Sequence, residues 1–268
     1  GTVTIGSIEK FLTETAWENN WVKPIKVKNE INKSIGIIGA GPAGLACAEE
    51  LRKKNYKVTV YDRYDRAGGL LIYGIPNFKL EKHVVLRRIK YLEECGVKFV
   101  NNFEVGKDKS FKELKERHNA ILIAIGVYKA REIELPGSDL GNIFPAIDFL
   151  TASNRKSFGD KVELFDNGIL NADGKNVVVI GGGDTAMDCV RTSVRQNASS
   201  VKCLYRRDKE NMPGSIREVA NAEEEGVEFV WKLIPKEFLG KNKIENILVD
   251  KIKLGEPDDS RRRKPEIQ

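Results

Sequence analysis

Two copies of a dinucleotide-binding signature constrain the fold of this 268-residue chain more than any other feature. Each copy is a glycine-rich turn between a strand-like run and a helix-like run, and the turns begin at Gly39 and Gly181 (181 − 39 = 142 residues apart). Glycines in such a turn let the backbone approach a pyrophosphate, which the N-terminus of the following helix attracts. We therefore expect an α/β protein with two Rossmann-like domains that bind two nucleotides.

The first copy, residues 39–44, predicts a site for FAD or NAD. A second strand-like run ends at Asp62, which lies 23 residues beyond Gly39 (62 − 39 = 23). A carboxylate at this spacing suits the two hydroxyl groups of an adenosine ribose and disfavours a 2′-phosphate. A glycine turn without a ligand is the alternative, and the strand, helix, second strand and acid together make it the weaker one. The contacts expected here are Gly39, Gly41, Pro42, Ala43, Gly44, Asp62 and Arg63.

The second copy, residues 181–186, predicts a site for NADPH. Ala186 replaces the third glycine, which is a known variant of the signature. The second strand of this copy ends in Arg206 and Arg207, where an NAD site would carry an acid. Two guanidinium groups can bind a 2′-phosphate through charge-assisted hydrogen bonds. The alternative interpretation of these residues is a solvated basic turn. The expected contacts are Gly181, Gly182, Gly183, Asp184, Thr185, Ala186, Arg206 and Arg207, with Arg217 in support.

The composition agrees with a two-domain enzyme and not with a membrane protein or a nucleic-acid-binding protein. With 41% hydrophobic residues, the chain can form one large or two modest cores. No apolar run reaches membrane-spanning length and no signal peptide opens the chain, so a cytoplasmic location is expected. The net charge is +6, but the basic residues are scattered among acids except at residues 261–264, which we interpret as a solvated strand or turn.

The cysteines and histidines do not suggest a reactive centre, and no metal ligand is predicted. The four cysteines are widely spaced and include no C-x-x-C pair, which argues against a disulfide framework, a metal cluster and a thioredoxin-reductase type of redox site. We expect them to be small core residues, namely Cys47, Cys95, Cys189 and Cys203. His83 and His118 are expected to have surface roles.

The periodicity of the apolar residues predicts the order of the elements. A helix capped by Thr4 is expected over residues 4–19. A doubly wound half follows, with strands near 35–38, 58–61, 97–100 and 120–125 and helices near 42–54, 82–95 and 110–117. The polar stretch 155–174 is expected to be a linker. The second half is predicted to have strands at 176–180, 200–205 and 227–231, helices at 184–195 and 215–225, and an antiparallel hairpin over 234–254.

Three further segments carry a resemblance to a known family. They are GGLLIYGIPNFKL at residues 68–80, MPGSIREVA at 212–220 and GVEF at 226–229. Together they resemble the small (beta) subunit of NADPH-dependent glutamate synthase and its relatives, and the likeness covers almost the whole chain. The resemblance implies a glutathione-reductase-like two-domain flavoprotein in which the loop after residue 68 lies beside the flavin. It therefore adds four residues to the expected FAD contacts, namely Gly69, Leu70, Val105 and Gly126.

The resemblance also implies domain limits and an electron path. Residues 1–30 would be a remnant of an N-terminal helical iron–sulfur domain, 31–154 the FAD-binding domain and 155–268 the NADPH-binding domain. NADPH would reduce FAD by hydride transfer, and electrons would pass through [4Fe–4S] clusters to the large (alpha) subunit, which makes glutamate from glutamine and 2-oxoglutarate. The clusters belong to the full-length family and are not expected to bind this chain. Because the cofactors carry the chemistry, no catalytic residue is predicted.

Two alternatives to this function stay open at the level of the sequence. One is a related NADPH-dependent flavoprotein that serves ferredoxin or a pyrimidine reductase as its acceptor. The other is a nucleotide-binding fragment without turnover. The family extends beyond both ends of this sequence, so we interpret the chain as a fragment that lacks the C-terminal part of the FAD domain and is expected to hold FAD weakly.

Overall fold

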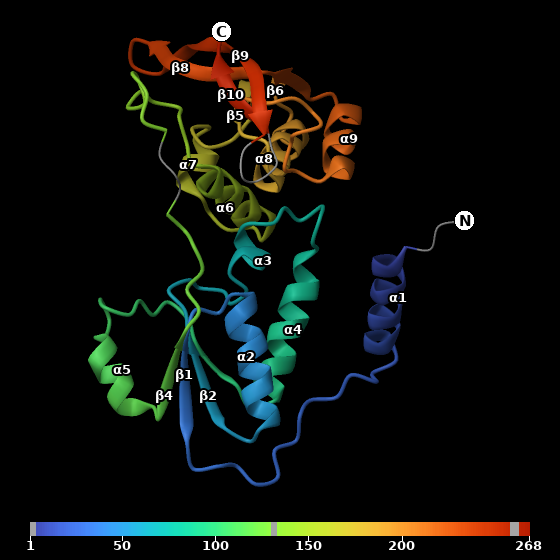
Figure 1. The fold of residues 1–268 in the computed structure, drawn as a ribbon. Helices are drawn as coiled ribbons and strands as arrows, with labels where there is room; N and C mark the ends of the chain where they lie inside the picture. The colour runs from blue at the N-terminus through green and yellow to red at the C-terminus, as the bar shows by residue number, and fades with distance from the viewer. Residues whose placement is uncertain (1–3, 130–132, 258–262) are drawn as a thin grey trace. The chain divides into compact units, whose positions relative to one another are not determined.

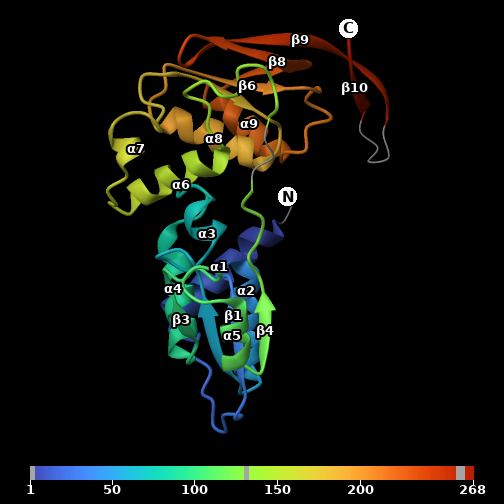
Figure 2. The ribbon, with the colours of Figure 1, turned by 90° about the vertical axis from the view of Figure 1, so that its left-hand side faces the viewer.

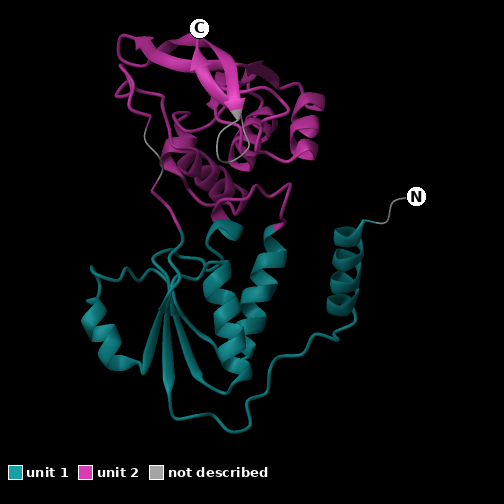
Figure 3. Cartoon of the chain, in the orientation of Figure 1, with its two compact units in different colours: residues 1–72, 82–126 teal, residues 73–81, 127–268 magenta. Residues whose placement is uncertain are grey.

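The computed structural model of the chain describes residues 4–129, 133–257 and 263–268 and divides into two compact units (Figure 3). Unit 1 comprises residues 1–72 and 82–126, and unit 2 comprises residues 73–81 and 127–268. The chain therefore passes between the units three times. Unit 2 begins well before residue 155, the predicted start of the NADPH domain, and it includes an excursion, residues 73–81, from within the predicted FAD domain.

Unit 1 is built on a four-stranded parallel sheet with the strand order β3-β2-β1-β4. The strands are β1 (Ser34–Ile38), β2 (Lys57–Tyr61), β3 (Lys98–Val100) and β4 (Ala120–Ile123). Helices α2 (Pro42–Lys53) and α4 (Lys82–Glu94) cover one face of this sheet, and α5 (Phe111–Arg117) covers the other (Figure 1). Cover on both faces explains why the central strands are almost wholly apolar. The predicted doubly wound half is confirmed.

The main core of unit 1 lies between the sheet and its two-helix face. Ile37 and Val60 from the central strands are fully buried there and share the core with Leu45, Ala48 and Leu92 from the helices. Helix α1 (Ile5–Glu18) joins the same unit, since the ring of Trp17 packs edge-on against Tyr91 with centroids 5.9 Å apart. Thr4 occupies the N-cap position of α1 as predicted, but its side chain makes no capping hydrogen bond.

His118 is a structural residue of unit 1, and the predicted surface role is wrong. Its ring is half-buried between Ser34 Oγ and Tyr61 Oη, each 2.9 Å from one ring nitrogen. Gly36 makes room for the ring, because a Cβ at that position would lie 2.7 Å from His118 Cδ2. His83, in contrast, is exposed.

Unit 2 combines a parallel and an antiparallel sheet. The parallel sheet has the order β5-β6-β7 and the antiparallel sheet the order β10-β9-β8. Figure 2 shows the three antiparallel strands. The parallel strands are β5 (Asn176–Ile180), β6 (Ser200–Tyr205) and β7 (Glu228–Trp231). The antiparallel strands are β8 (Leu233–Gly240), β9 (Ile244–Pro257) and β10 (Arg263–Ile267). The predicted hairpin is thus confirmed and extended by β10.

The core of unit 2 surrounds helix α8 (Asp184–Arg195), which packs against α9 (Ile216–Glu224) and α6 (Ala146–Ser157). Met187, Val190 and Cys203 are fully or almost fully buried in it. Because α6 packs on α8, residues 146–154 belong to this unit and not to unit 1.

The predicted linker over residues 155–174 is wrong as a description of the structure. The stretch contains the end of α6 and the short helix α7 (Glu163–Asp166). Leu170 and Ala172 are buried, and Lys175 donates from Nζ to the carbonyl oxygen atoms of Gly168 and Asn171. The stretch is packed against the rest of unit 2. The sequence predicted a linker because most of its residues are polar and only a few, such as Leu170 and Ala172, are apolar and buried.

The remaining expectations from composition fall on surface and core positions. Cys95, Cys189 and Cys203 are buried and Cys47 is half-buried, all four as free thiols. Of the basic run, residues 261–262 lie outside the described residues, and the rest of the run begins β10. In the part of the chain that the structure describes, no helix has both the length and the apolar character needed to cross a bilayer.

Candidate functional site

The first glycine turn has the close contacts that its signature requires. Gly39, after β1, has φ +106°, and a Cβ there would lie 2.3 Å from the carbonyl oxygen of Ala124. A Cβ at Gly44 would lie 2.0 Å from the carbonyl oxygen of Gly39, so this glycine lets α2 pack against the turn. Gly41 has open space around the position of a Cβ. The turn thus combines tight packing behind it with free approach at Gly41, which a pyrophosphate site needs.

Both glycine turns lead into helices whose first N–H groups have no side-chain cap. Gly41 is the N-cap of α2 and Gly183 the N-cap of α8, and neither helix has a capping hydrogen bond from its N-cap side chain. Helices α1, α6, α7 and α9 also lack a hydrogen bond from the N-cap side chain, and α5 alone of the helices with a described N-cap residue has a capping box, so the glycine turn and not the missing cap distinguishes α2 and α8. The first N–H groups of a helix need a partner, and together with the helix dipole they favour an anion. Both turns fit a phosphate group.

Asp62 joins the end of β2 to the first glycine turn. It is 8% exposed. Its Oδ2 accepts a hydrogen bond from the backbone N–H of Ala40 (2.6 Å), and its Oδ1 accepts one from the backbone N–H of Tyr64 (2.9 Å). A carboxylate can accept about four hydrogen bonds, so these two leave capacity for ribose hydroxyl groups. The neighbouring Arg63 is exposed.

The structure brings two more expected FAD residues towards this turn by backbone contacts. The backbone N–H of Phe103 donates to the carbonyl oxygen of Asp62 (2.9 Å), which brings the half-buried Val105 into the same region. Gly126, with φ +66°, lies two residues after Ala124, whose backbone N–H donates to the carbonyl oxygen of Ile38 next to Gly39 (2.8 Å).

Gly69 and Leu70 stand at the start of the short helix α3 (Leu70–Tyr73). Gly69 is buried with φ +54°, and Leu70 is 41% exposed. Gly69 has a left-handed backbone conformation that favours glycine, and the apolar side chain of Leu70 is exposed to solvent.

The second glycine turn packs against an aromatic ring and is overlaid by a loop. A Cβ at Gly182 would lie 2.4 Å from Cε2 of Tyr205, so the turn has no space for a side chain there. The backbone N–H of Gly214 donates to the carbonyl oxygen of Gly182 (2.8 Å), and the N–H of Ser215 donates to Asp184 Oδ1 (3.0 Å). The segment 212–220 therefore lies at this turn. Among the other residues expected to contact the nucleotide at the second glycine turn, Thr185 is exposed and Ala186 is buried.

The paired arginines after β6 lie in different environments. Arg206 is exposed. Arg207 is 5% exposed, and its Nε donates to the carbonyl oxygen of Arg263 in β10 (2.7 Å). Arg217 is exposed in the first turn of α9. Sequence alone did not distinguish the two neighbours, because the partner of Arg207 lies 56 residues away.

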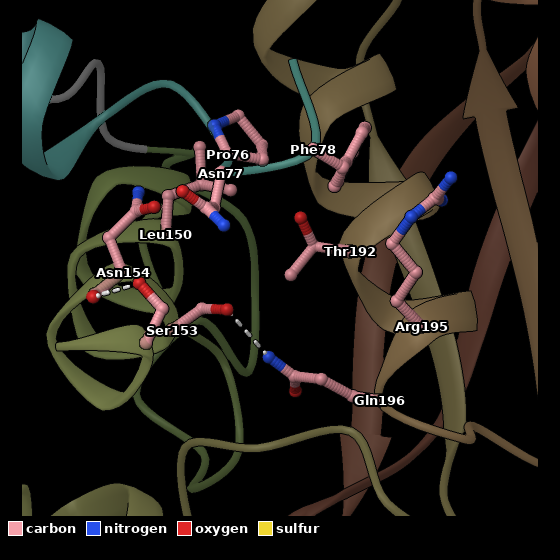
Figure 4. Close-up of a pocket in the computed structure, with 10 residues that line it drawn as sticks. Pro76, Asn77, Phe78, Leu150, Ser153, Asn154, Thr192, Arg195 and Gln196 are labelled. Atoms are coloured by element: carbon pink, nitrogen blue, oxygen red, sulfur yellow. Dashed lines mark hydrogen bonds between the residues drawn. The ribbon is translucent and has the colours of Figure 1, made fainter. Parts of the chain in front are cut away.

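Unit 2 also contains a cavity that none of the predicted site residues lines. Its volume is about 200 Å³, and Pro76, Asn77 and Leu150 are among its walls (Figure 4). The hydroxyl group of Thr192 is buried and has no hydrogen-bond partner within the described residues. Gln196 Nε2 donates to Ser153 Oγ (3.0 Å) on another wall. The α8 residues in these walls come from the C-terminal end of the helix, so the cavity is distinct from the glycine turn at its N-terminus.

Comparison with known proteins identifies the family of this two-turn arrangement. The model of the family described as "Pyridine nucleotide-disulphide oxidoreductase" matches residues 33–258, which is most of the chain and includes both turns. The chain belongs to this family. The predicted α/β fold with two Rossmann-like units and the predicted oxidoreductase class are confirmed.

Within the pyridine nucleotide-disulphide oxidoreductase family, the chain is most usefully compared with two individual relatives. The chain is 61% identical to the glutamate synthase [NADPH] small chain of Azospirillum brasilense over 267 residues, which are 100% of this chain and 55% of that protein. It is 44% identical to the putative oxidoreductase AegA of Escherichia coli, covering 99% of this chain and 40% of that one. The resemblance seen in the sequence is thus confirmed, while the chain spans only about half the length of these relatives.

A solved structure shares the fold. FprA of Mycobacterium tuberculosis, in complex with NADPH, superposes with a TM-score of 0.74 over 88% of this chain and 67% of that chain. The sequence identity is 20%, so this likeness supports the fold alone.

Proposed function

We propose that the chain is the electron-input part of a glutamate synthase, in which NADPH bound in unit 2 reduces FAD bound in unit 1. Support comes from the family, from the 61% identity to a glutamate synthase [NADPH] small chain, and from the two glycine turns, each of which leads into the N-terminus of a helix. Onward transfer would run through [4Fe–4S] clusters outside this chain to the large (alpha) subunit, where glutamine and 2-oxoglutarate give glutamate. A cytoplasmic location belongs to the same proposal.

The proposed FAD site uses the first turn and the residues around it. FAD supplies the capacity to accept a hydride and to release single electrons. The chain binds and orients it: the N-terminus of α2 holds the pyrophosphate, and Asp62 accepts hydrogen bonds from the ribose while it keeps Ala40 in place. The further proposed contacts are Pro42, Ala43, Arg63, Gly69, Leu70, Val105 and Gly126.

One contrast carries the assignment of the two nucleotides to the two units. A buried acid, Asp62, follows β2 in unit 1, whereas an exposed arginine, Arg206, follows β6 at the equivalent point of unit 2. An acid repels a 2′-phosphate and a guanidinium group binds it. We therefore place NADPH in unit 2. Arg206 binds the 2′-phosphate, Arg217 from α9 contributes a second positive charge, and Arg207 holds the loop after β6 in place through its hydrogen bond to Arg263. Gly181, Gly182, Gly183, Asp184, Thr185 and Ala186 form the proposed pyrophosphate cradle.

Anaerobic titration of the purified chain with FAD present tests the proposal. NADPH should bleach the visible flavin band far more effectively than NADH, because only NADPH carries the phosphate that Arg206 binds. A chain that binds NADPH and FAD without bleaching would be a nucleotide-binding module without turnover. A chain that reacts equally with both nucleotides would contradict the assignment of unit 2.

The final electron acceptor needs its own test, since a relative named only as a putative oxidoreductase matches the same residues. If the proposal is right, NADPH oxidation by the protein together with a glutamate synthase large subunit should depend on glutamine and 2-oxoglutarate. Equal oxidation in their absence, with ferredoxin as an effective acceptor, would favour the related flavoprotein instead.

A further inference from the structure

Two carboxylates meet between α8 and α9 of unit 2, one helical turn beyond the second glycine turn. Asp188 follows Asp184 by one turn on α8, and Glu218 follows Ser215 by one turn on α9. Their side chains are 11% and 17% exposed. Each has an oxygen atom within 3.3 Å of the same atom, the Nζ of Lys79. Two acids that contact one ammonium group would repel each other in this partly buried setting without cations beside them; Lys79 contacts both, and Arg191 also pairs with Glu218.

Lys79 belongs to the excursion 73–81, which docks on α8 through two neighbouring side chains. Lys79 Nζ lies 2.8 Å from Asp188 Oδ1. The ring of Phe78 lies against the guanidinium groups of Arg195 and Arg191, at 3.8 and 4.9 Å from the ring centroid. The three α8 residues lie on one face of the helix, so the ring and the ammonium group hold the excursion along that face.

The other links between α8 and α9 join groups of complementary character. At the N-terminal ends, Asp184 accepts a hydrogen bond from the backbone N–H of Ser215 (3.0 Å). Further along, Arg191 pairs with Glu218 and with Glu225, each at 2.7 Å. These links attract without help from a third element. Opposite Asp188 lies Glu218, a second acid that Arg191 of α8 also pairs, and the attraction between Asp188 and Glu218 comes from Lys79.

From this geometry we propose that Lys79 is a positioning residue of the nucleotide site in unit 2. Its ammonium group joins Asp188 of α8 to Glu218 of α9 and acts together with the Arg191–Glu218 pair to set the spacing of the two helices at this level. Helix α8 begins at the glycine turn, and α9 carries Arg217 immediately before Glu218. Loss of Lys79 would let the two helices separate at this level and would move Arg217 away from the turn. The inference rests on the proposed binding of NADPH at this turn.

The charges around Asp188 predict how the loss of Lys79 depends on pH. Burial raises the pKa of Asp188, Lys79 opposes this, and the negative charges of Glu218 and Asp184 raise it further. Without Lys79, the acid would relieve the repulsion by taking up a proton at low pH, and the neutral carboxyl group could then donate a hydrogen bond to Glu218. Binding of nucleotide to a variant without Lys79 should therefore be weak at high pH and recover as the pH falls.

Titration of NADP⁺ into the Lys79→Met variant tests this inference. At about pH 8 we expect the Kd to rise about tenfold, and at about pH 5.5 we expect most of the loss to be reversed. The double variant Lys79→Met/Asp188→Asn should bind normally at both pH values, because an amide can donate to Glu218. Lys236→Met is the matched control, since it removes an exposed lysine paired with Asp250 at 3.1 Å on β8 and β9 of the same unit.

Hydrogen exchange separates this inference from the proposed function. The backbone N–H groups of the buried residues Val219 and Ala222 on α9 should exchange faster in Lys79→Met and return to the wild-type rate in the double variant, with no nucleotide present. Unchanged exchange, or a loss of affinity that the Asp188→Asn change does not reverse, would overturn the role of Lys79. A wild-type chain that binds no NADP⁺ but shows this exchange pattern would refute the nucleotide assignment and leave the spacing role supported.

Discussion

Arg207 is fastened to Arg263: its Nε donates to the carbonyl oxygen of that residue at 2.7 Å, and its side chain is almost wholly withdrawn from solvent. Its neighbour Arg206 is exposed. A pair that the sequence presents as one basic patch therefore has two functions. One arginine links the end of β6 to β10, and the other is available to a ligand.

Replacement of Arg206 by alanine should abolish the preference for NADPH. A charge-assisted hydrogen bond contributes about 1.5–3 kcal/mol, so kcat/KM for NADPH should fall about tenfold to a hundredfold while that for NADH stays nearly constant. Steady-state rates with both nucleotides and an artificial acceptor measure this. Equal losses for the two would show that Arg206 does not meet the 2′-phosphate.

Replacement of Arg207 by methionine should have the opposite profile. The variant retains an apolar stem of similar length but leaves the carbonyl oxygen of Arg263 without its donor, which costs about 1–3 kcal/mol of unfolding free energy. The midpoint of thermal unfolding should fall, and the ratio of NADPH to NADH activity should not change. A lost preference at unchanged stability would instead place Arg207 on the phosphate.

Alanine at Gly182 and at Gly183 should separate folding from binding at the second turn. A Cβ at Gly182 would overlap the ring of Tyr205, and overpacking of this kind costs about 1–3 kcal/mol. A Cβ at Gly183 meets open space, so that variant should keep its stability and lose affinity only because the methyl group obstructs the pyrophosphate. Paired unfolding curves and NADP⁺ titrations check both. Normal binding by Gly183→Ala would show that the phosphates lie elsewhere.

His118 should make unit 1 less stable in mild acid. Burial lowers the pKa of this histidine below its ordinary value of 6.5, with the positive charge of Arg117 adding to the effect. Between the two values the unfolded chain binds a proton that the folded chain does not, so the unfolding free energy decreases as the pH falls from 6.5 towards the folded pKa, and this contribution is constant below it. The contribution above pH 6.5 is also constant.

Urea unfolding of the wild-type chain and of His118→Gln across this interval measures the effect. Glutamine can bond to Ser34 and Tyr61 but does not titrate, so the variant should show the weaker pH dependence. The same slope in both proteins would assign the dependence to other groups.

The elements and the two turns could be predicted because their determinants are local. The apolar runs of β1 and β5, with a glycine turn and a helix after each, predict the sheet and the turn within a few tens of residues. Spacing from these turns also predicts Asp62 and the pair Arg206 and Arg207 as nucleotide contacts. Such features depend on backbone geometry and periodicity, which a single sequence displays.

The contacts that the sequence did not reveal all join distant positions. Lys79 meets Asp188 across 109 residues, and Arg207 meets Arg263 across 56. The apolar character of a residue such as Leu170 predicts that it is buried but does not predict which element packs against it. For the same reason the polar stretch 155–174 resembled a linker, and the membership of residues 73–81 in unit 2 was not foreseen.

The excursion 73–81 limits how this protein could be recombined during evolution. A gene segment that starts at Val127 encodes α8 and α9 but omits Phe78 and Lys79, so it would pass on two facing acids without their counter-ion. A crossover between two diverged relatives anywhere from residue 82 to residue 126 would join an excursion from one parent to the helices of the other. Unit 2 is therefore inherited intact only when residues 73–81 and 127–268 come from the same parent, and residues 82–126 of unit 1, which lie between them, are then inherited with it.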